Sequence, residues 1–157
     1  MKNLKILLSI TVLLVSSISL GGCSFGNKAV PTIIFGTCWL DTISGGNRDS
    51  AGDFLVSSST PDLVLRGWIA NDVADESPKN VTAIIADSQG QILISASSPS
   101  TGRPDVAQAY NKPGMANSGF EILIENVKTP GKYAVSLQGE YATGNLLCSK
   151  TFNLVVG

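Results

Sequence analysis

Histidine is absent from this sequence of 157 residues, and its absence excludes several kinds of chemistry. A Ser-His-Asp triad and a Cys-His pair both need an imidazole as the base. Histidine is also the commonest protein ligand for metals such as zinc and copper. An enzyme built from this chain would have to use carboxylates, tyrosine or lysine. No spacing in the sequence aims two acids at a common point, so we expect no catalytic residue, no metal and no cofactor.

Cysteine is scarce, and the first of the three stands directly behind two glycines. The chain begins with a positive charge at Lys2 and Lys5, continues with an apolar run over residues 6–20, and reaches Cys23 through Gly21 and Gly22. This arrangement is typical of a secretory signal, because the apolar run is too short and too poorly flanked to form a stable membrane span. We therefore expect a signal peptide over residues 1–22.

The stretch LGGC, residues 20–23, resembles the lipobox of bacterial lipoproteins. The resemblance implies that Cys23 receives a diacylglyceryl group, and often a further acyl chain on its amine, so that several chains anchor it in the lipid bilayer. Ser24, in place of Asp, implies the outer membrane of a diderm bacterium. Residues 23–31 then form the lipidated cysteine and a tether of at most about 25–30 Å, which keeps the domain close to the membrane. The alternative is an ordinary signal peptide that ends near a chance cysteine.

Basic charge is scarce in the remaining 135 residues, where nine Lys and Arg face twelve Asp and Glu for a net charge of −3. Nucleic-acid binding and a polybasic contact with anionic lipid both need clustered Lys and Arg. The composition therefore predicts no nucleic-acid partner. The acidic residues are scattered, so they do not indicate a cationic substrate either.

Cys38 and Cys148 are the two cysteines left once Cys23 is lipidated, and each lies in an apolar stretch near one end of residues 32–157. Disulfides persist in exported compartments. A bridge between the two would close a loop of about 110 residues, which stabilises by roughly 4–5 kcal/mol in the chain-entropy model. We expect this bridge. The alternative is a pair of free thiols, of which one could be reactive.

Residues 32–157 read as one domain of short strands separated by turns that are rich in Gly, Pro, Asn and Asp. The clearest hairpin covers residues 81–97, with Asp87-Ser88-Gln89-Gly90 as the turn and Gly90 available for a positive φ. Only residues 103–114 break the pattern, and Pro104 with Asp105 favours a short helix there. About eight strands at this spacing predict an immunoglobulin-like antiparallel β-sandwich with one short helix. The alternative is a closed β-barrel.

Aromatic side chains are the first candidates for ligand contacts. Trp68 lies in a strand and Trp39 lies next to Cys38, and a tryptophan near the bridge of a sandwich is usually packed in the core. We expect both in the core. The alternative for Trp68 is a flat platform for a sugar ring, a role that an exposed tyrosine could also take. The three tyrosines are Tyr110, Tyr133 and Tyr141.

Arg103 and Asp105 flank Pro104 in the series GW, RPDV and SGF over residues 63–148, which is similar to a recurring module of bacterial cell-surface proteins. The resemblance implies structural roles, in which Asp105 caps the short helix and Arg103 ties it to a neighbouring strand. The alternative is that Arg103 recognises an anionic group of a ligand. A further alternative is a calcium site at Asp72, Asp75 and Glu76, although the spacing is not that of an EF-hand.

The sequence therefore predicts a lipid-anchored, non-catalytic interaction or structural module in the bacterial cell envelope, with an envelope protein as its partner. The alternative is a carbohydrate-binding module for a surface polysaccharide or peptidoglycan. An interaction module would show an exposed apolar patch or an unpaired edge strand.

Overall fold

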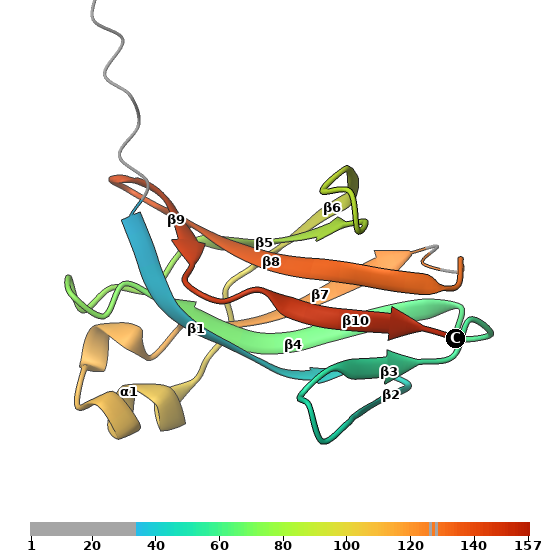
Figure 1. Cartoon of the computed structure of the whole chain (residues 1–157). Coiled ribbons are helices and arrows are strands. Elements are labelled where there is room, and N and C mark those ends of the chain that lie inside the picture. Colours follow the sequence, from blue (N-terminus) through green and yellow to red (C-terminus); the bar gives the residue numbers. More distant parts are fainter. Residues whose placement is uncertain (1–33, 126, 128) are drawn as a thin grey trace, which may run out of the picture. The chain divides into compact units, whose positions relative to one another are not determined.

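A computed structural model of the chain describes residues 34–125, 127 and 129–157. The predicted signal peptide, Cys23 and the tether lie outside these residues. The described elements form an all-β sandwich-like fold with one α-helix (Figure 1). In chain order they are β1 (Ile34–Ile43), β2 (Gly46–Arg48), β3 (Phe54–Val56), β4 (Asp62–Ala70), β5 (Asn80–Ala86), β6 (Ile92–Pro99), α1 (Pro104–Tyr110), the 3₁₀ turn η1 (Pro113–Met115), β7 (Gly119–Glu125), β8 (Gly131–Tyr141), β9 (Gly144–Cys148) and β10 (Phe152–Val156).

The first layer is organised around the long strand β8. One edge of β8 pairs with β5, which in turn pairs with β6. The other edge pairs with β10 along the first half of β8 and with β9 along the second half. Beyond β10 the layer continues through β3 to β2. The free edges of this layer are therefore β6 at one side and β2 at the other.

The second layer consists of β1, β4 and β7, and β1 also joins it to the first. Residues Ile34 to Gly36 run parallel to β9, whereas Thr37 to Ile43 run antiparallel to β4. The register shifts between Leu40 and Thr42, which marks an irregularity where the strand bends. One strand thus serves both layers without closing a barrel. The sandwich prediction is confirmed, although the β1–β9 and β10–β3 pairs are parallel and the sheet is mixed.

Alternation of side chains explains how the two layers form a core. In β8, buried residues at every second position face the other layer, and the residues between them are partly exposed. Strand β5 shows the same period, and β4 shows it up to Arg66, after which its last four residues are all buried. The largest side chains that are fully buried are Leu40, Leu63, Leu65, Ile69, Ile85, Met115, Ile122, Ile124, Leu137, Leu154, Val81 and Val135.

The predicted hairpin is present as β5 and β6. Asp87 at the start of its turn accepts hydrogen bonds from the backbone N–H groups of Gln89 and Gln91, each at 2.9 Å, through its Oδ1. Gly90 has a φ of 79°, the left-handed conformation that glycine adopts without steric cost. The turn residues therefore act as the sequence predicts.

Two strands were not expected. β2 lies inside the Gly- and Asn-rich segment that predicts a loop, and it pairs with β3 over three residues. The last predicted strand is divided into β9 and β10 by residues 149–151. Cys148 belongs to the strand that pairs with β1, so the chain must bend after it before β10 can return to the edge of β8. The described residues therefore form ten strands, where about eight were expected.

The short helix α1 and the turn η1 cover one end of β4. Trp68 and Ala70 of β4 form a small second cluster with Val106 and Met115, apart from the main core. Ile69, which lies between them in sequence, belongs to the main core. The two clusters thus lie on opposite faces of β4, and the helical segment buries the outer face at this end (Figure 1).

Candidate functional site

The disulfide between Cys38 and Cys148 is formed, as the sequence predicts, with the two Cα atoms 5.6 Å apart. Cys38 lies in β1 and Cys148 ends β9, and the neighbouring Gly36 is in register with Cys148 in the parallel pair of these strands. The bridge therefore fastens the first strand of the domain to a strand close to its end.

Trp68 is a core residue, as expected. Only 8% of it is exposed, because Val106 and Met115 pack against it. The ring of Tyr110 meets it edge-on, with the ring centroids 5.4 Å apart. A sugar ring needs an open aromatic face, so this burial argues against Trp68 as a platform.

Two of the three tyrosines offer no open platform either. Tyr133 and Tyr141 are buried, and the hydroxyl of Tyr133 donates a hydrogen bond to the backbone oxygen of Thr129 at 2.7 Å. Burial, with a smaller effect from the charge of Glu76, raises the pKa of Tyr141. Tyr110 is partly exposed, but it packs on Trp68.

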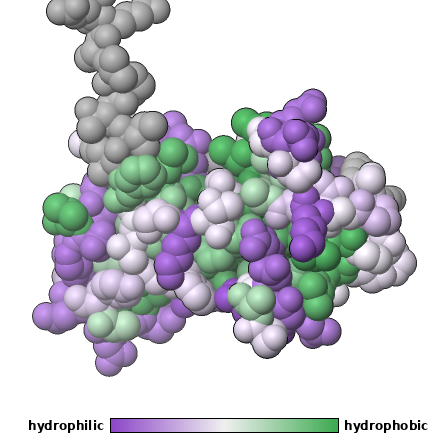
Figure 2. All heavy atoms as spheres, viewed as in Figure 1, coloured by the Kyte–Doolittle hydropathy of each residue, from purple (hydrophilic) through white to green (hydrophobic). Residues whose placement is uncertain are grey.

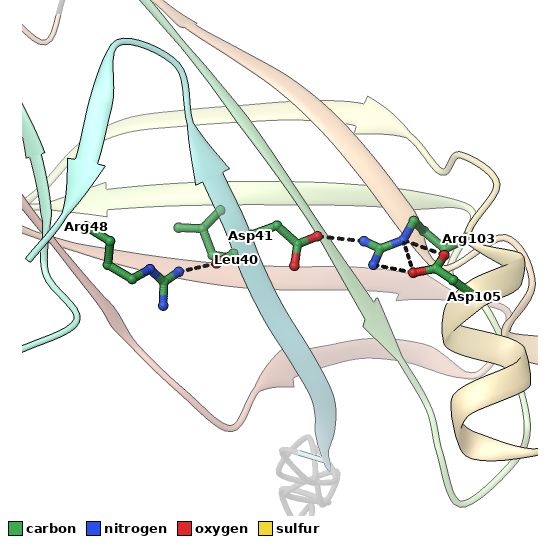
Figure 3. Close-up of polar contacts among 5 residues, drawn as sticks. All are labelled: Leu40, Asp41, Arg48, Arg103 and Asp105. Atoms are coloured by element: carbon green, nitrogen blue, oxygen red, sulfur yellow. Dashed lines mark hydrogen bonds and ion pairs between the residues drawn. The ribbon is translucent and has the colours of Figure 1, made fainter. Parts of the chain in front are cut away.

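Arg103 is engaged by two carboxylates (Figure 3). Its Nη1 lies 2.7 Å from Asp41 Oδ2, and its Nη2 lies 2.8 Å from Asp105 Oδ2. Its Nε also donates to both oxygens of Asp105, at 2.9 and 3.2 Å. These bonds raise the pKa of Arg103. The pairing with Asp41 ties the start of α1 to β1 and leaves little of the guanidinium for an anionic ligand.

Asp105 does not cap the helix, so that prediction was wrong. The residue before α1 is Arg103, and no side chain makes a capping hydrogen bond. The carboxylate of Asp105 instead accepts the bonds from Arg103, which lower its pKa. The guanidinium of Arg103 is the main partner of this carboxylate, and the backbone N–H groups of Asp105 and Val106 lower its pKa to a smaller extent.

The acidic residues proposed for calcium do not gather into a metal site. Asn71 and Glu76 form an isolated bridge, and Asn71 Oδ1 accepts the backbone N–H of Ala74 at 3.0 Å, so the segment is a closed turn. Within residues 34–125, 127 and 129–157, no three His, Cys, Asp or Glu side chains are grouped to hold a metal ion.

The prediction that Trp39 lies in the core was wrong. Trp39 is 37% exposed, although we expected it in the core. The neighbouring residues Cys38 and Leu40 are buried, and successive side chains of a strand point to opposite faces. This period-two rule could have found the exposed tryptophan once Cys38 was assigned to the bridge.

A shallow depression surrounds Trp39, and we call it the Trp39 depression. The guanidinium carbon of Arg48 lies 5.2 Å from the centroid of the Trp39 ring, and Lys150 Nζ lies 4.4 Å from it. Arg48 also lies 4.2 Å from the ring centroid of Phe54 and donates to the backbone oxygen of Leu40 (Figure 3). The full lining is Trp39, Arg48, Ala51, Gly52, Asp53, Lys150, Thr151, Phe152 and Asn153.

A second exposed feature is the strand β6. Among the described strands it pairs with β5 alone, and Ile92 and Leu93 at its start are 62% and 48% exposed. Figure 2 shows hydrophobic surface beside the polar tip of the β5–β6 hairpin. Next to the strand is a pocket, here called the β6 groove, lined by Ile85, Leu93, Ile94, Glu125, Val127, Thr129 and Tyr133.

Comparison with models of known protein families and with curated protein sequences finds no match. In the described part of the chain, no helix has the length and the apolar character needed to cross a membrane. The functional conclusion therefore depends on the residues and their geometry.

Proposed function

We propose that this chain is a lipid-anchored, non-catalytic interaction module of a bacterial cell envelope, and that it binds an extended segment of an envelope protein along β6. The observation that carries this proposal is the unpaired, uncharged and partly apolar edge of β6. The lipobox-like sequence before Cys23 supports the anchor, and the bridge between Cys38 and Cys148 fits an exported compartment.

The edge of β6 carries little of the usual protection against pairing. Proteins commonly guard edge strands with charged side chains, proline or bulges. The sequence of β6, ILISASSP, has no charge and has proline only at its last position. Its register with β5 is regular from Asn80 to Ile85, and one β-bulge follows at Leu93, because Ile85 pairs with Ile94 whereas Ala86 pairs with Ile92. A long, uncharged edge with free backbone donors and acceptors can accept a further strand from a partner.

The β6 groove indicates which side chains that partner presents. Five of its seven lining residues are apolar or aromatic, and they can receive the alternating apolar side chains of an added strand. Glu125 at the groove favours a basic residue in the same segment, in keeping with the net negative charge of the domain. We therefore expect an extended partner segment with alternating apolar residues and at least one Lys or Arg.

Site-specific photocrosslinking in cells tests this proposal. A photoreactive residue replaces Leu93 in the full-length, anchored protein, and the matched control replaces Val73, which is 91% exposed but lies in the loop after β4. We expect one discrete protein adduct from position 93 only, and its crosslinked peptide should be an alternating apolar segment. The adduct should be lost in an Ile92→Lys variant, because a desolvated ammonium opposes apolar packing. Cys23→Ala should also abolish it by removing the anchor.

Equal labelling from both positions, or an adduct that Ile92→Lys does not affect, would contradict docking along β6. An adduct with a second copy of this chain would show that β6 mediates self-association, and it would contradict an envelope protein as the partner. If the Cys23→Ala variant stays at the membrane and still forms the adduct, lipid anchoring at Cys23 is contradicted, whereas docking along β6 is not.

The alternative of a carbohydrate-binding module is not supported at Trp68, which is buried. Phe35, Trp39 and Tyr110 are exposed aromatic residues, and Trp39 has two cations beside its ring, in a different part of the structure.

A further inference from the structure

We infer that the Trp39 depression is a second binding site, and that its ligand is an acidic sugar, a pyranose ring that carries a carboxylate or phosphate group. The site is separate from the β6 groove and shares no lining residue with it. This inference therefore stands independently of the protein partner proposed for β6.

Trp39 presents a rigid aromatic surface. It lies in β1, in register with Trp68 of β4, so its backbone is held within the second layer. Its ring meets Phe152 edge-on, with the centroids 6.0 Å apart and an interplanar angle of 89°. A fixed indole that keeps 37% of its surface exposed can take the apolar face of a sugar ring with little loss of entropy.

Two cations beside this indole supply the preference for an acidic group. Within residues 34–125, 127 and 129–157, neither Arg48 nor Lys150 forms an ion pair, whereas Arg66 and Arg103 do. Arg48 is held by the backbone oxygen of Leu40 and by an aromatic ring, so it is a fixed charge. Two unpaired cations at one place are notable in a domain whose net charge is negative.

Lys150 is the group that a ligand would move. Its ammonium rests near the indole, an interaction that contributes only about 0.5–1 kcal/mol at an exposed site. A sugar ring can displace it from the aromatic surface. The ammonium then pairs with the acidic group of the ligand, a stronger interaction than the one it gives up.

Asp53 and Asn153 explain why the ligand is a sugar and not a simple anion. Asn153 Nδ2 donates to Asp53 Oδ1 at 2.8 Å, and both residues line the depression. The carboxylate repels a bare phosphate or a polyanion, but it accepts hydrogen bonds from hydroxyl groups. A sugar ring can place its hydroxyl groups against Asp53 and Asn153 and its acidic group against Lys150.

The disulfide holds the two sides of this site together. Cys38 is adjacent to Trp39, and Cys148 is two residues before Lys150. The bend over residues 149–151 that divides β9 from β10 carries Lys150 to the indole. The bridge therefore fixes the aromatic surface and the cation relative to one another before any ligand binds.

The test is binding of the detergent-solubilised full-length protein to an array of glycans in matched pairs, in which each uronic-acid or phosphorylated sugar stands beside its neutral counterpart. We expect acidic members to bind more tightly than their neutral partners. Titration with the best acidic glycan should lose about tenfold or more in affinity in Trp39→Ala and in Lys150→Gln, the loss expected for one aromatic or charge-assisted contact. Lys79→Gln removes the same charge outside the depression and should leave the affinity unchanged.

Absence of binding to every acidic glycan would overturn the inference, and so would equal binding of acidic and neutral partners. Binding that survives both Trp39→Ala and Lys150→Gln would place the site elsewhere. Ile92→Lys should not change glycan affinity, so failure of the β6 proposal and failure of this one are distinguishable.

Discussion

At the scale of single residues, the exposed side of each strand decides what the protein can contact. Trp68 and Trp39 are opposite each other in register, yet the first is covered by the helical segment and the second is partly open. Arg103, the residue that the sequence offers for recognising an anion, is neutralised by Asp41 and Asp105. Arg48 and Lys150, which the sequence did not single out, are the cations beside an aromatic surface.

Asp41→Asn should lower the free energy of unfolding by roughly 1 kcal/mol, because it removes one of the two carboxylates that hold the partly buried guanidinium of Arg103. The difference should shrink at high salt, where the remaining charges are screened. Urea denaturation at low and high NaCl measures both effects. Glu121→Gln breaks the more exposed pair with Arg66 and serves as the control with no measurable change expected. Equal losses in the two variants would contradict a special role for Arg103.

At the scale of elements, the helical segment and the strand edges were harder to foresee than the strands. The period-two alternation of β7 and β8 predicts these two strands directly, and the Asp87 to Gly90 turn predicts the hairpin. β2 and the division between β9 and β10 depend on pairing partners that lie far away in sequence, and no local pattern marks them. The helical segment is predictable as a helix, but its role as the cover of Trp68 is not.

Met115→Ala should loosen this cover. Met115 is fully buried against Trp68, and a Met→Ala change in a buried site typically costs about 2–5 kcal/mol through lost transfer energy and the cavity left behind. In a Trp39→Phe background, where Trp68 is the only tryptophan, its emission should move to longer wavelength. Gln108→Ala on the exposed side of α1 is the matched control. Unchanged emission and stability in Met115→Ala would show that the segment does not bury Trp68 in solution.

At the scale of the whole molecule, the bridge between Cys38 and Cys148 and the shared strand β1 join the two layers. Opening the bridge releases a loop constraint that spans 110 residues of sequence. The stabilisation is therefore expected to come mainly from the unfolded state, which the closed loop restricts.

Replacing both bridge cysteines by serine should lower the free energy of unfolding by roughly 4–5 kcal/mol, the value for a loop of this length. Equilibrium urea denaturation, followed by circular dichroism, measures the change. Wild-type protein treated with reductant is the control and should match the variant. A loss below about 1 kcal/mol would show that the unfolded chain is already compact or that native strain offsets the constraint.

The sequence by itself determined the strand-rich fold, the hairpin, the pairing of Cys38 with Cys148 and the core position of Trp68. Alternation and turn residues are patterns among neighbouring residues, and the cysteines can be counted, so these features need no knowledge of distant contacts. The lipid anchor at Cys23 and the envelope location remain predictions of the sequence. Only the tertiary structure decided that Arg103 is paired, that β6 is an open edge, and that Trp39, Arg48 and Lys150 meet. These three lie on β1, on β2 and in the β9–β10 bend, and their contact depends on β1 passing between two layers. No pattern confined to neighbouring residues carries that information.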